Sequence, residues 1–151
     1  MSTRSAFLRT TAAAALVTFG LAGCGMMKSM SSNTETFTAS MSGAQESPPA
    51  TTAATGNAEV TYNRDTSMLA YRVTYSGLSG PATASHIHGP AGPGQNAGVV
   101  VPFTNVGTSP FSGEVRITPE QFNQLSSGQW YVNVHTAAHP AGEIRGQLRR
   151  R

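Results

Sequence analysis

A regular alternation of apolar and polar residues recurs in this chain and constrains its fold more than any other feature. In the segment LAYRVTY (69–75), every second residue from Leu69 onward is apolar, and the same pattern recurs in AEVTY (58–62), WYVNVH (130–135) and EIRGQL (143–148). Side chains alternate between the two faces of a β-strand, so each segment predicts a strand with one buried face. Alternating strands of this kind are typical of antiparallel sheets, and the chain is therefore predicted to be all-β.

Four further segments have the composition of short strands. They cover residues 36–42, 82–88, 98–103 and 111–117, and turn signals such as YNRDTS and TNVGTSP separate them from their neighbours. Several short strands without a long, continuously apolar run predict an antiparallel β-sandwich or a closed barrel.

One segment interrupts the strand pattern and predicts a single short helix near 119–127. In TPEQFNQLSSG, Thr118 is placed to cap the helix, Pro119 suits its first position and Gln121 completes a capping box. Gly128 provides the stop signal. The helix is expected to connect two strands.

The first 23 residues have the features of a bacterial lipoprotein signal peptide. Arg4 and Arg9 precede an apolar stretch that is too short for a convincing membrane span. The sequence LAGC resembles a lipobox, which implies cleavage before Cys24 and lipidation of that cysteine; an ordinary secretory signal with an unrelated thiol is the alternative. Because Gly25 rather than aspartate follows the cysteine, we expect an outer-membrane lipoprotein of the cell envelope, with its domain in the periplasm or at the cell surface.

The remaining chain is expected to contain one domain. Residues 24–35 form the lipidated cysteine and a flexible polar tether, residues 36–148 the domain, and residues 149–151 a basic tail. The chain has ten basic and seven acidic residues, but eight against seven remain once the two signal-peptide arginines are removed, a net charge of +1. A net charge this close to zero does not indicate the basic surface that binds nucleic acid, and no nucleic-acid partner is expected. The tail is expected to be a solvated terminus, with contact to anionic lipid as the alternative.

The four histidines fall into two clusters, His86 with His88 and His135 with His139. Residues i and i+2 of a strand share a face, so His86 and His88 project together, and His135 lies on the polar side of its own strand. If the two strands are neighbours, three imidazoles converge as ligands for copper or zinc, and His139 is a candidate fourth ligand. The alternative is that these histidines are ordinary polar residues of a strand surface.

Three residues are candidate neighbours of this site. Tyr131, Glu143 and Arg145 would share a face with His135 if their strands pair as a hairpin, and could then orient the ligands. A surface ion pair between Glu143 and Arg145 is the alternative. Other catalytic patterns are missing from the sequence, including a G-x-S-x-G nucleophile motif and a paired-carboxylate cue. We therefore expect a non-enzymatic protein.

Three blocks of the sequence resemble the CHRD domain, a module named from the animal protein chordin and common in secreted and lipidated bacterial proteins. They are SGAQESPP, ASHIHGPAGPGQNAGVVVPF and GQWYVNVHTAAHPAGEIRGQL, and the resemblance spans about residues 36–148. It implies an immunoglobulin-like sandwich without implying a settled activity. The family pattern matches His86, His88 and His135, and it also matches Glu46, which becomes a further candidate neighbour, whereas His139 departs from it.

A weaker similarity connects the chain to copper/zinc superoxide dismutases, which are also β-sandwiches with a His-x-His strand. The chain lacks the aspartate ligand and the disulfide of those enzymes, so an activity of this kind would be copper-only. We expect a lipid-anchored binding module with a possible copper or zinc site. The alternatives are a small copper-dependent redox or dismutase-like enzyme and a structural adhesion domain without metal. The protein partner, if there is one, is not identified by the sequence.

Overall fold

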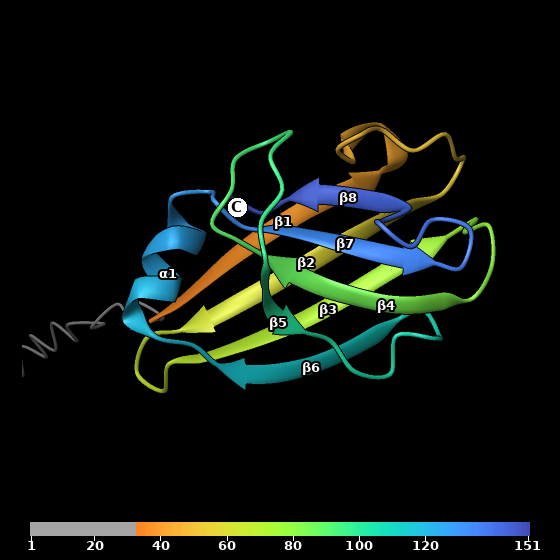
Figure 1. Cartoon of the computed structure of the whole chain (residues 1–151). Helices are drawn as coiled ribbons and strands as arrows, with labels where there is room; N and C mark the ends of the chain where they lie inside the picture. The colour runs from red at the N-terminus through yellow and green to blue at the C-terminus, as the bar shows by residue number, and fades with distance from the viewer. Residues whose placement is uncertain (1–32) are drawn as a thin grey trace, which may run out of the picture. The chain divides into compact units, whose positions relative to one another are not determined.

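The computed structural model describes residues 33–151 (Figure 1). The signal peptide, Cys24 and most of the tether predicted from the sequence lie outside these described residues, and the last two tether residues, 34 and 35, belong to the first strand. Within the described range, no helix is long and apolar enough to cross a membrane.

The chain forms nine β-strands, one 3-10 turn and one α-helix over the described residues. In chain order these are β1 (Thr34–Ser42), η1 (Gly43–Gln45), β2 (Thr55–Asn63), β3 (Met68–Ser76), β4 (Ala82–His88), β5 (Val99–Pro102), β6 (Phe111–Arg116), α1 (Pro119–Ser126), β7 (Tyr131–Thr136), β8 (Ile144–Gln147) and β9 (Arg149–Arg150). Each strand predicted from the sequence is present, with its ends shifted by three residues or fewer.

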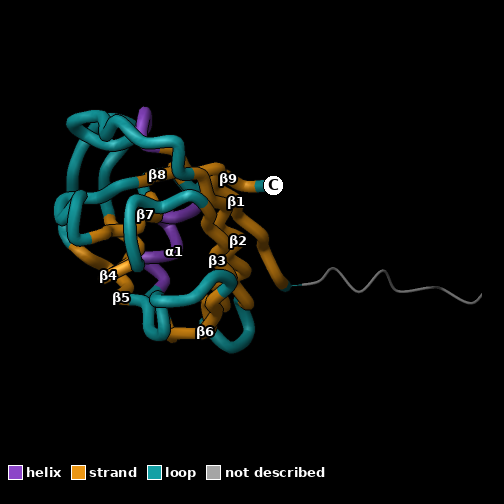
Figure 2. The backbone as a smooth tube through the Cα atoms, turned by 90° about the vertical axis from the view of Figure 1, so that its right-hand side faces the viewer, coloured by secondary structure: helices purple, strands orange, loops and turns teal. Residues whose placement is uncertain are grey.

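The strands are arranged in two layers that join along one side. Their hydrogen-bonded order is β5-β4-β7-β8-β1-β2-β3-β6, with β9 beside β1, and every pairing is antiparallel. In Figure 1, β4, β7 and β8 lie in front of β1, β2 and β3, and Figure 2 shows the sheet curving round between the two layers. The pair Ser42–Arg145 connects β1 to β8. The result is a nearly closed, barrel-like antiparallel sheet with one short helix, which confirms the predicted fold class.

The alternating residues of the strands fill the space between the layers. Trp130, Phe37, Leu69, Ile87 and Val132 are fully buried there. Burial of such side chains contributes on the order of 1.5–3 kcal/mol each to folding.

Helix α1 closes one end of this core. Its Phe122 stacks on Tyr62 with ring centroids 4.3 Å apart and meets the edge of Phe37. The predicted capping box is present, since Thr118 accepts from the Gln121 backbone while the Gln121 side chain accepts from Thr118. This pair fixes where the helix begins.

The outer face of β7 is buried, which the alternation alone does not predict. Tyr131 and Asn133 are each only 3% exposed although they point away from the core. Residues 89–98, which we call the cover loop, fold back over β7 and β8 (Figure 1). The loop is attached by hydrogen bonds from Ala91 to the Gln129 carbonyl and from the Gln147 side chain to the Ala91 carbonyl. The cover loop therefore buries the outer face of β7 as well as turning the chain after β4.

The basic C-terminal residues continue the sheet. Arg149 and Arg150 pair with Thr38 and Phe37 of β1 as strand β9, although both residues remain exposed. The guanidinium of Arg150 forms an ion pair with Glu35. The expected tail thus has an ordered backbone with solvated side chains.

Candidate metal centre

The pairing of β4 with β7 brings the two histidine clusters together. In this ladder His86 lies opposite Asn133, and His135 lies opposite Ala84, two residues before His86. The alternate residues Ile87 and Val134 point into the core and are fully buried. His86, His88 and His135 consequently leave the same outer face of the sheet, as the sequence pattern predicts for adjacent strands.

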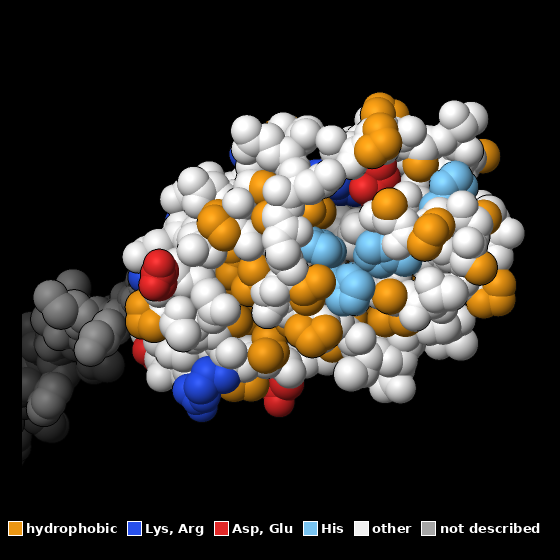
Figure 3. Space-filling model, viewed as in Figure 1, with side chains coloured by type: hydrophobic (Ala, Val, Ile, Leu, Met, Phe, Trp, Pro, Cys, Tyr) orange, Lys and Arg blue, Asp and Glu red, His pale blue; other side chains and the backbone are white. Residues whose placement is uncertain are grey.

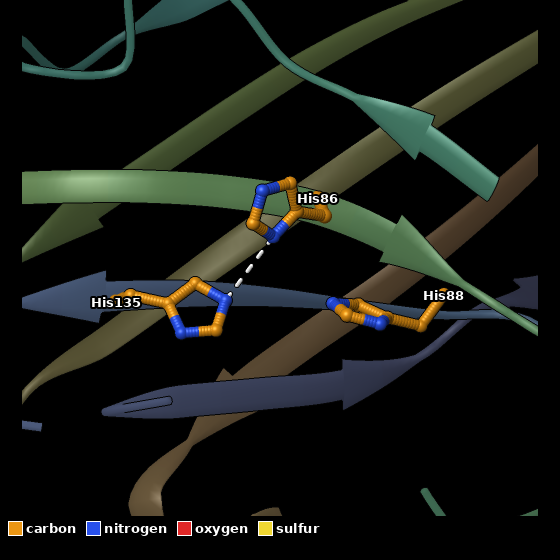
Figure 4. Close-up of side chains that lie close together, drawn as sticks. All are labelled: His86, His88 and His135. Carbon is orange, nitrogen blue, oxygen red and sulfur yellow. Dashed lines mark hydrogen bonds between the residues drawn. The ribbon is translucent and has the colours of Figure 1, made fainter. Parts of the chain in front are cut away.

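The three imidazoles surround a common point. One nitrogen from each of His86, His88 and His135 lies within 4.8 Å of the others. Nδ1 of His86 is 3.2 Å from Nε2 of His135, and Figure 4 shows a His88 nitrogen directed toward that pair. Metal–imidazole bonds of about 2.0–2.1 Å place neighbouring ligand nitrogens roughly 2.9–3.4 Å apart at angles between square and tetrahedral. The His86–His135 separation already has this value.

Backbone carbonyls fix the orientation of two of the rings. The Nδ1–H of His135 donates to the carbonyl of Pro140 over 3.0 Å, and the Nδ1–H of His88 donates to the carbonyl of Ala97 over 3.0 Å. Both rings are thereby held in the tautomer whose Nε2 carries a lone pair. Metal-binding histidines are commonly oriented by a carbonyl in this way.

Asn133 is a site residue that the sequence reasoning did not identify. Its Oδ1 lies 3.0 Å from Nε2 of His88, and the residue is 3% exposed. With the carboxamide turned so that its NH2 group faces this nitrogen, Asn133 donates to the same Nε2 that His88 would offer to an ion, so metal binding requires Asn133 to turn away. Its position in the sequence could have identified it, because Asn133 lies on the same face of its strand as Tyr131 and His135.

The pKa values of two of the histidines are lowered, which favours their neutral form. Burial lowers the pKa of His86 below 6.5, and the neighbouring His135 and His88 lower it further. Burial also lowers the pKa of His135, and the effect of His88 adds to it against the opposing hydrogen bond to Pro140. Neutral imidazole is the form that binds metal.

Tyr131 and Arg145 form a stack against His88. The ring of His88 is parallel to that of Tyr131, with centroids 5.0 Å apart and an interplanar angle of 5°. The guanidinium carbon of Arg145 lies 3.4 Å from the centroid of the Tyr131 ring. Tyr131 is therefore adjacent to a candidate ligand and Arg145 lies next to Tyr131, and the hairpin of β7 and β8 that places them is present.

Glu143 is not brought to the histidines. It is fully buried, and its carboxylate accepts hydrogen bonds from Thr52, Ser79 and Thr136. Burial raises its pKa, but these hydrogen bonds outweigh that effect and lower the pKa to about 2. Glu143 and Arg145 are both inaccessible to solvent, and no ion pair joins them in the described part of the chain.

Glu46 lies near Arg145 and away from the three imidazoles. Its carboxylate packs directly on Gly142, whose φ of +135° and lack of a Cβ permit this contact. Burial raises the pKa of Glu46 to about 7, and the charge of Arg145 opposes the rise. Glu46 makes no hydrogen bond to a histidine among residues 33–151.

His139 lies outside the three-histidine group, in the loop after β7. Its backbone exchanges hydrogen bonds with Thr136, and it lines a separate pocket together with Glu46. The structure therefore brings three of the four histidines together, and His139 is not among them.

The histidine group opens onto the surface. Histidine side chains gather near the middle of the face seen in Figure 3, surrounded by apolar atoms. His86 and His135 are partly exposed, whereas His88 is 9% exposed. A ligand from solvent can thus reach an ion held by the three nitrogens.

Comparison with protein families gives one match: the model of the CHRD domain matches residues 37–148. Comparisons with curated proteins and with solved structures give no significant match. The matched range contains all the strands from β2 to β8, most of β1, and the three converging histidines.

Proposed function

The chain belongs to the CHRD-domain family, and we propose that its domain is a non-enzymatic binding module that holds one copper or zinc ion at His86, His88 and His135. The observation that supports this most directly is the convergence of three imidazole nitrogens within 4.8 Å of one another. Their residues come from two strands almost fifty positions apart, so sequence proximity alone does not explain the cluster.

The ligand set favours a borderline transition metal over calcium or magnesium. Copper and zinc bind imidazole nitrogen, whereas the hard cations prefer several oxygens. No carboxylate joins the group of three within residues 33–151. Three protein ligands leave a fourth coordination position for water or for a group on a binding partner.

A copper-dependent redox or dismutase-like enzyme is the second candidate. The partly exposed His86 and His135 favour it, because a small substrate could approach the ion from solvent. This activity requires superoxide turnover by the copper-loaded protein that disappears in His86→Ala. Absence of superoxide turnover in a fully copper-loaded protein would reject the enzyme and favour the non-enzymatic binding module.

Bound-metal analysis of protein purified without a histidine tag tests the site. We expect one copper or zinc per chain after loading and gel filtration, and loss of stoichiometric metal in His86→Ala and in His135→Ala. His139→Ala is the matched control and should retain one ion. If the wild type binds no metal, or if all variants bind equally, the metal site is refuted and the structural adhesion domain is favoured.

We also propose that the module is attached to the outer membrane through a lipid on Cys24, which lies outside the described residues. The lipobox-like LAGC sequence supports this proposal. The native protein should partition with membranes, and Cys24→Ser should release it into the soluble envelope fraction. A Cys24→Ser protein that stays with the membrane would contradict lipid attachment.

A further inference from the structure

We infer that Arg145, which touches none of the three histidines, is a positioning residue of the metal site and holds His88 in its ligand orientation. The inference rests on the proposed metal-binding function. Arg145 acts through two routes, one through the Tyr131 ring and the other through the cover loop.

The environment of Arg145 is unusual for a charged side chain. It is 1% exposed, and it takes part in no ion pair in the part of the chain that the structure describes. The nearest opposite charge is the Glu46 carboxylate, which attracts the guanidinium without forming an ion pair with it. A buried charge is costly unless hydrogen bonds satisfy it. The direct contacts of the guanidinium are with the Tyr131 ring and with the cover loop, and both of these border His88.

The first route is the stack of three planar groups. The guanidinium of Arg145 covers one face of Tyr131 at 3.4 Å, and the Tyr131 ring stacks on His88. Cation–π attraction of this kind contributes more when the partners are shielded from water. Tyr131 is thereby fixed as a flat support that limits rotation of the His88 imidazole.

The second route is the cover loop. Arg145 donates to the carbonyls of Gly92 and Gln95 and to Oδ1 of Asn96, over 3.3, 2.7 and 3.1 Å. The next residue, Ala97, supplies the carbonyl that accepts from Nδ1–H of His88.

Tyr131 connects the two routes, because the backbone N–H of Ala97 donates to its hydroxyl over 3.1 Å. Removing the guanidinium should therefore loosen both the Tyr131 ring, which limits rotation of His88, and the Ala97 carbonyl, which fixes its tautomer. The planar fork is required, since a lysine ammonium can neither stack flat on the ring nor reach three acceptors in one plane.

Metal affinity in a double-mutant cycle tests the inference. Arg145→Met should weaken copper or zinc binding about 10- to 100-fold, the range found for residues that orient metal ligands. Arg145→Lys should lose a similar amount. In a His88→Ala background, Arg145→Met should cause no further loss, because its effect passes through His88. Arg72→Met, which removes an exposed strand arginine from the other layer, is the matched control and should bind as the wild type does.

The Cu(II) electron paramagnetic resonance spectrum provides a readout that simple destabilisation would not change. Arg145→Met should lose one coordinated imidazole, as His88→Ala does. Equal affinity and an unchanged spectrum in Arg145→Met, or additive losses in the double mutant, would overturn the inference while leaving the metal site intact.

A second readout requires no metal, so it separates this inference from failure of the proposed function. The ¹⁵N chemical shifts of the His88 ring should report a single Nδ1–H tautomer in the wild type and a mixture in Arg145→Met. A single unchanged tautomer in the folded variant would also overturn the inference.

Discussion

Replacement of Glu143 by glutamine should destabilise the fold that supports the site, although no histidine touches this residue. The carboxylate is fully buried and accepts four hydrogen bonds. Oε1 accepts from the Thr52 hydroxyl and the Ser79 backbone, both at 2.8 Å. Oε2 accepts from the hydroxyls of Ser79 and Thr136, at 2.7 and 2.6 Å. Glu143 thereby joins the end of β7 to two loops.

The expected loss is about 3 kcal/mol at pH 7. Glutamine can keep its oxygen at the Oε1 position while the Ser79 and Thr136 hydroxyls turn to accept from its NH2 group. The variant therefore loses charge assistance rather than the bonds themselves. Four bonds that each weaken by about 1 kcal/mol cost about 4 kcal/mol, and the lower cost of burying a neutral amide offsets roughly 1 kcal/mol of this. The lowered pKa of Glu143 has the same cause, because these hydrogen bonds favour its ionised form.

The pH dependence has a definite sign. The pKa of Glu143 is lower in the folded state, so its ionised form stabilises the fold fully above pH 4.5. That contribution is lost as pH falls from 4.5 to about 2. The stability difference between wild type and Glu143→Gln should therefore shrink over this window.

Urea unfolding at pH 7 and at pH 3 measures both effects. Glu59→Gln, at a side chain that is 52% exposed, is the control and should change stability by less than about 0.5 kcal/mol. A Glu143→Gln protein as stable as the wild type at pH 7, or a difference that does not depend on pH, would refute the reasoning.

Two further predictions concern ionisation near the site. Burial raises the pKa of Glu46 from 4.5 to about 7, so ionisation of this carboxyl lowers the stability of the wild type as pH rises through that range. The free energy of unfolding of Glu46→Gln, measured with urea relative to the wild type, should therefore rise by about 1–3 kcal/mol between pH 5 and pH 8. A stability difference that does not change with pH would contradict this. The pKa values of His86 and His135 lie below 6.5, so protons compete less with zinc for these rings. Zinc affinity should therefore fall by less between pH 7.5 and pH 6 than the roughly 50-fold expected for three exposed imidazoles. A larger fall in competition titrations would contradict the lowered pKa values.

The sequence predicts the strands and the direction of their side chains because both depend on local periodicity. The range predicted for β4, residues 82–88, is the observed one, and the capping box of α1 was readable from Thr118 and Gln121. The shared face of His86 and His88 follows from the same period of two. Local pattern alone was sufficient for these features.

The sequence does not predict what lies over the outer face of β7. Alternation identifies a polar face, but it gives no information on whether water or a loop covers that face. Tyr131 and Asn133 are buried because the cover loop returns over them, and the loop is attached through long-range contacts of Arg145 and Gln147. The orienting carbonyls of Ala97 and Pro140 carry no side-chain signal at all.

The different positions of Glu143 and Arg145 also required the structure. The two residues are two positions apart, which would place them on the same face of a regular strand, but β8 begins only at Ile144, between them. Glu143 lies just before the ladder and turns toward Thr136, whereas Arg145 lies within it and reaches Tyr131. A difference of one residue in where a strand starts separates the two environments.

A crystal structure of the untagged protein with copper or zinc, measured at the absorption edge of the metal, tests the central claim most directly. We expect one anomalous peak about 2.0–2.1 Å from a ring nitrogen of each of His86, His88 and His135. A fully loaded crystal with its peak elsewhere, or with His88 more than 3 Å from the ion, would contradict the three-histidine site.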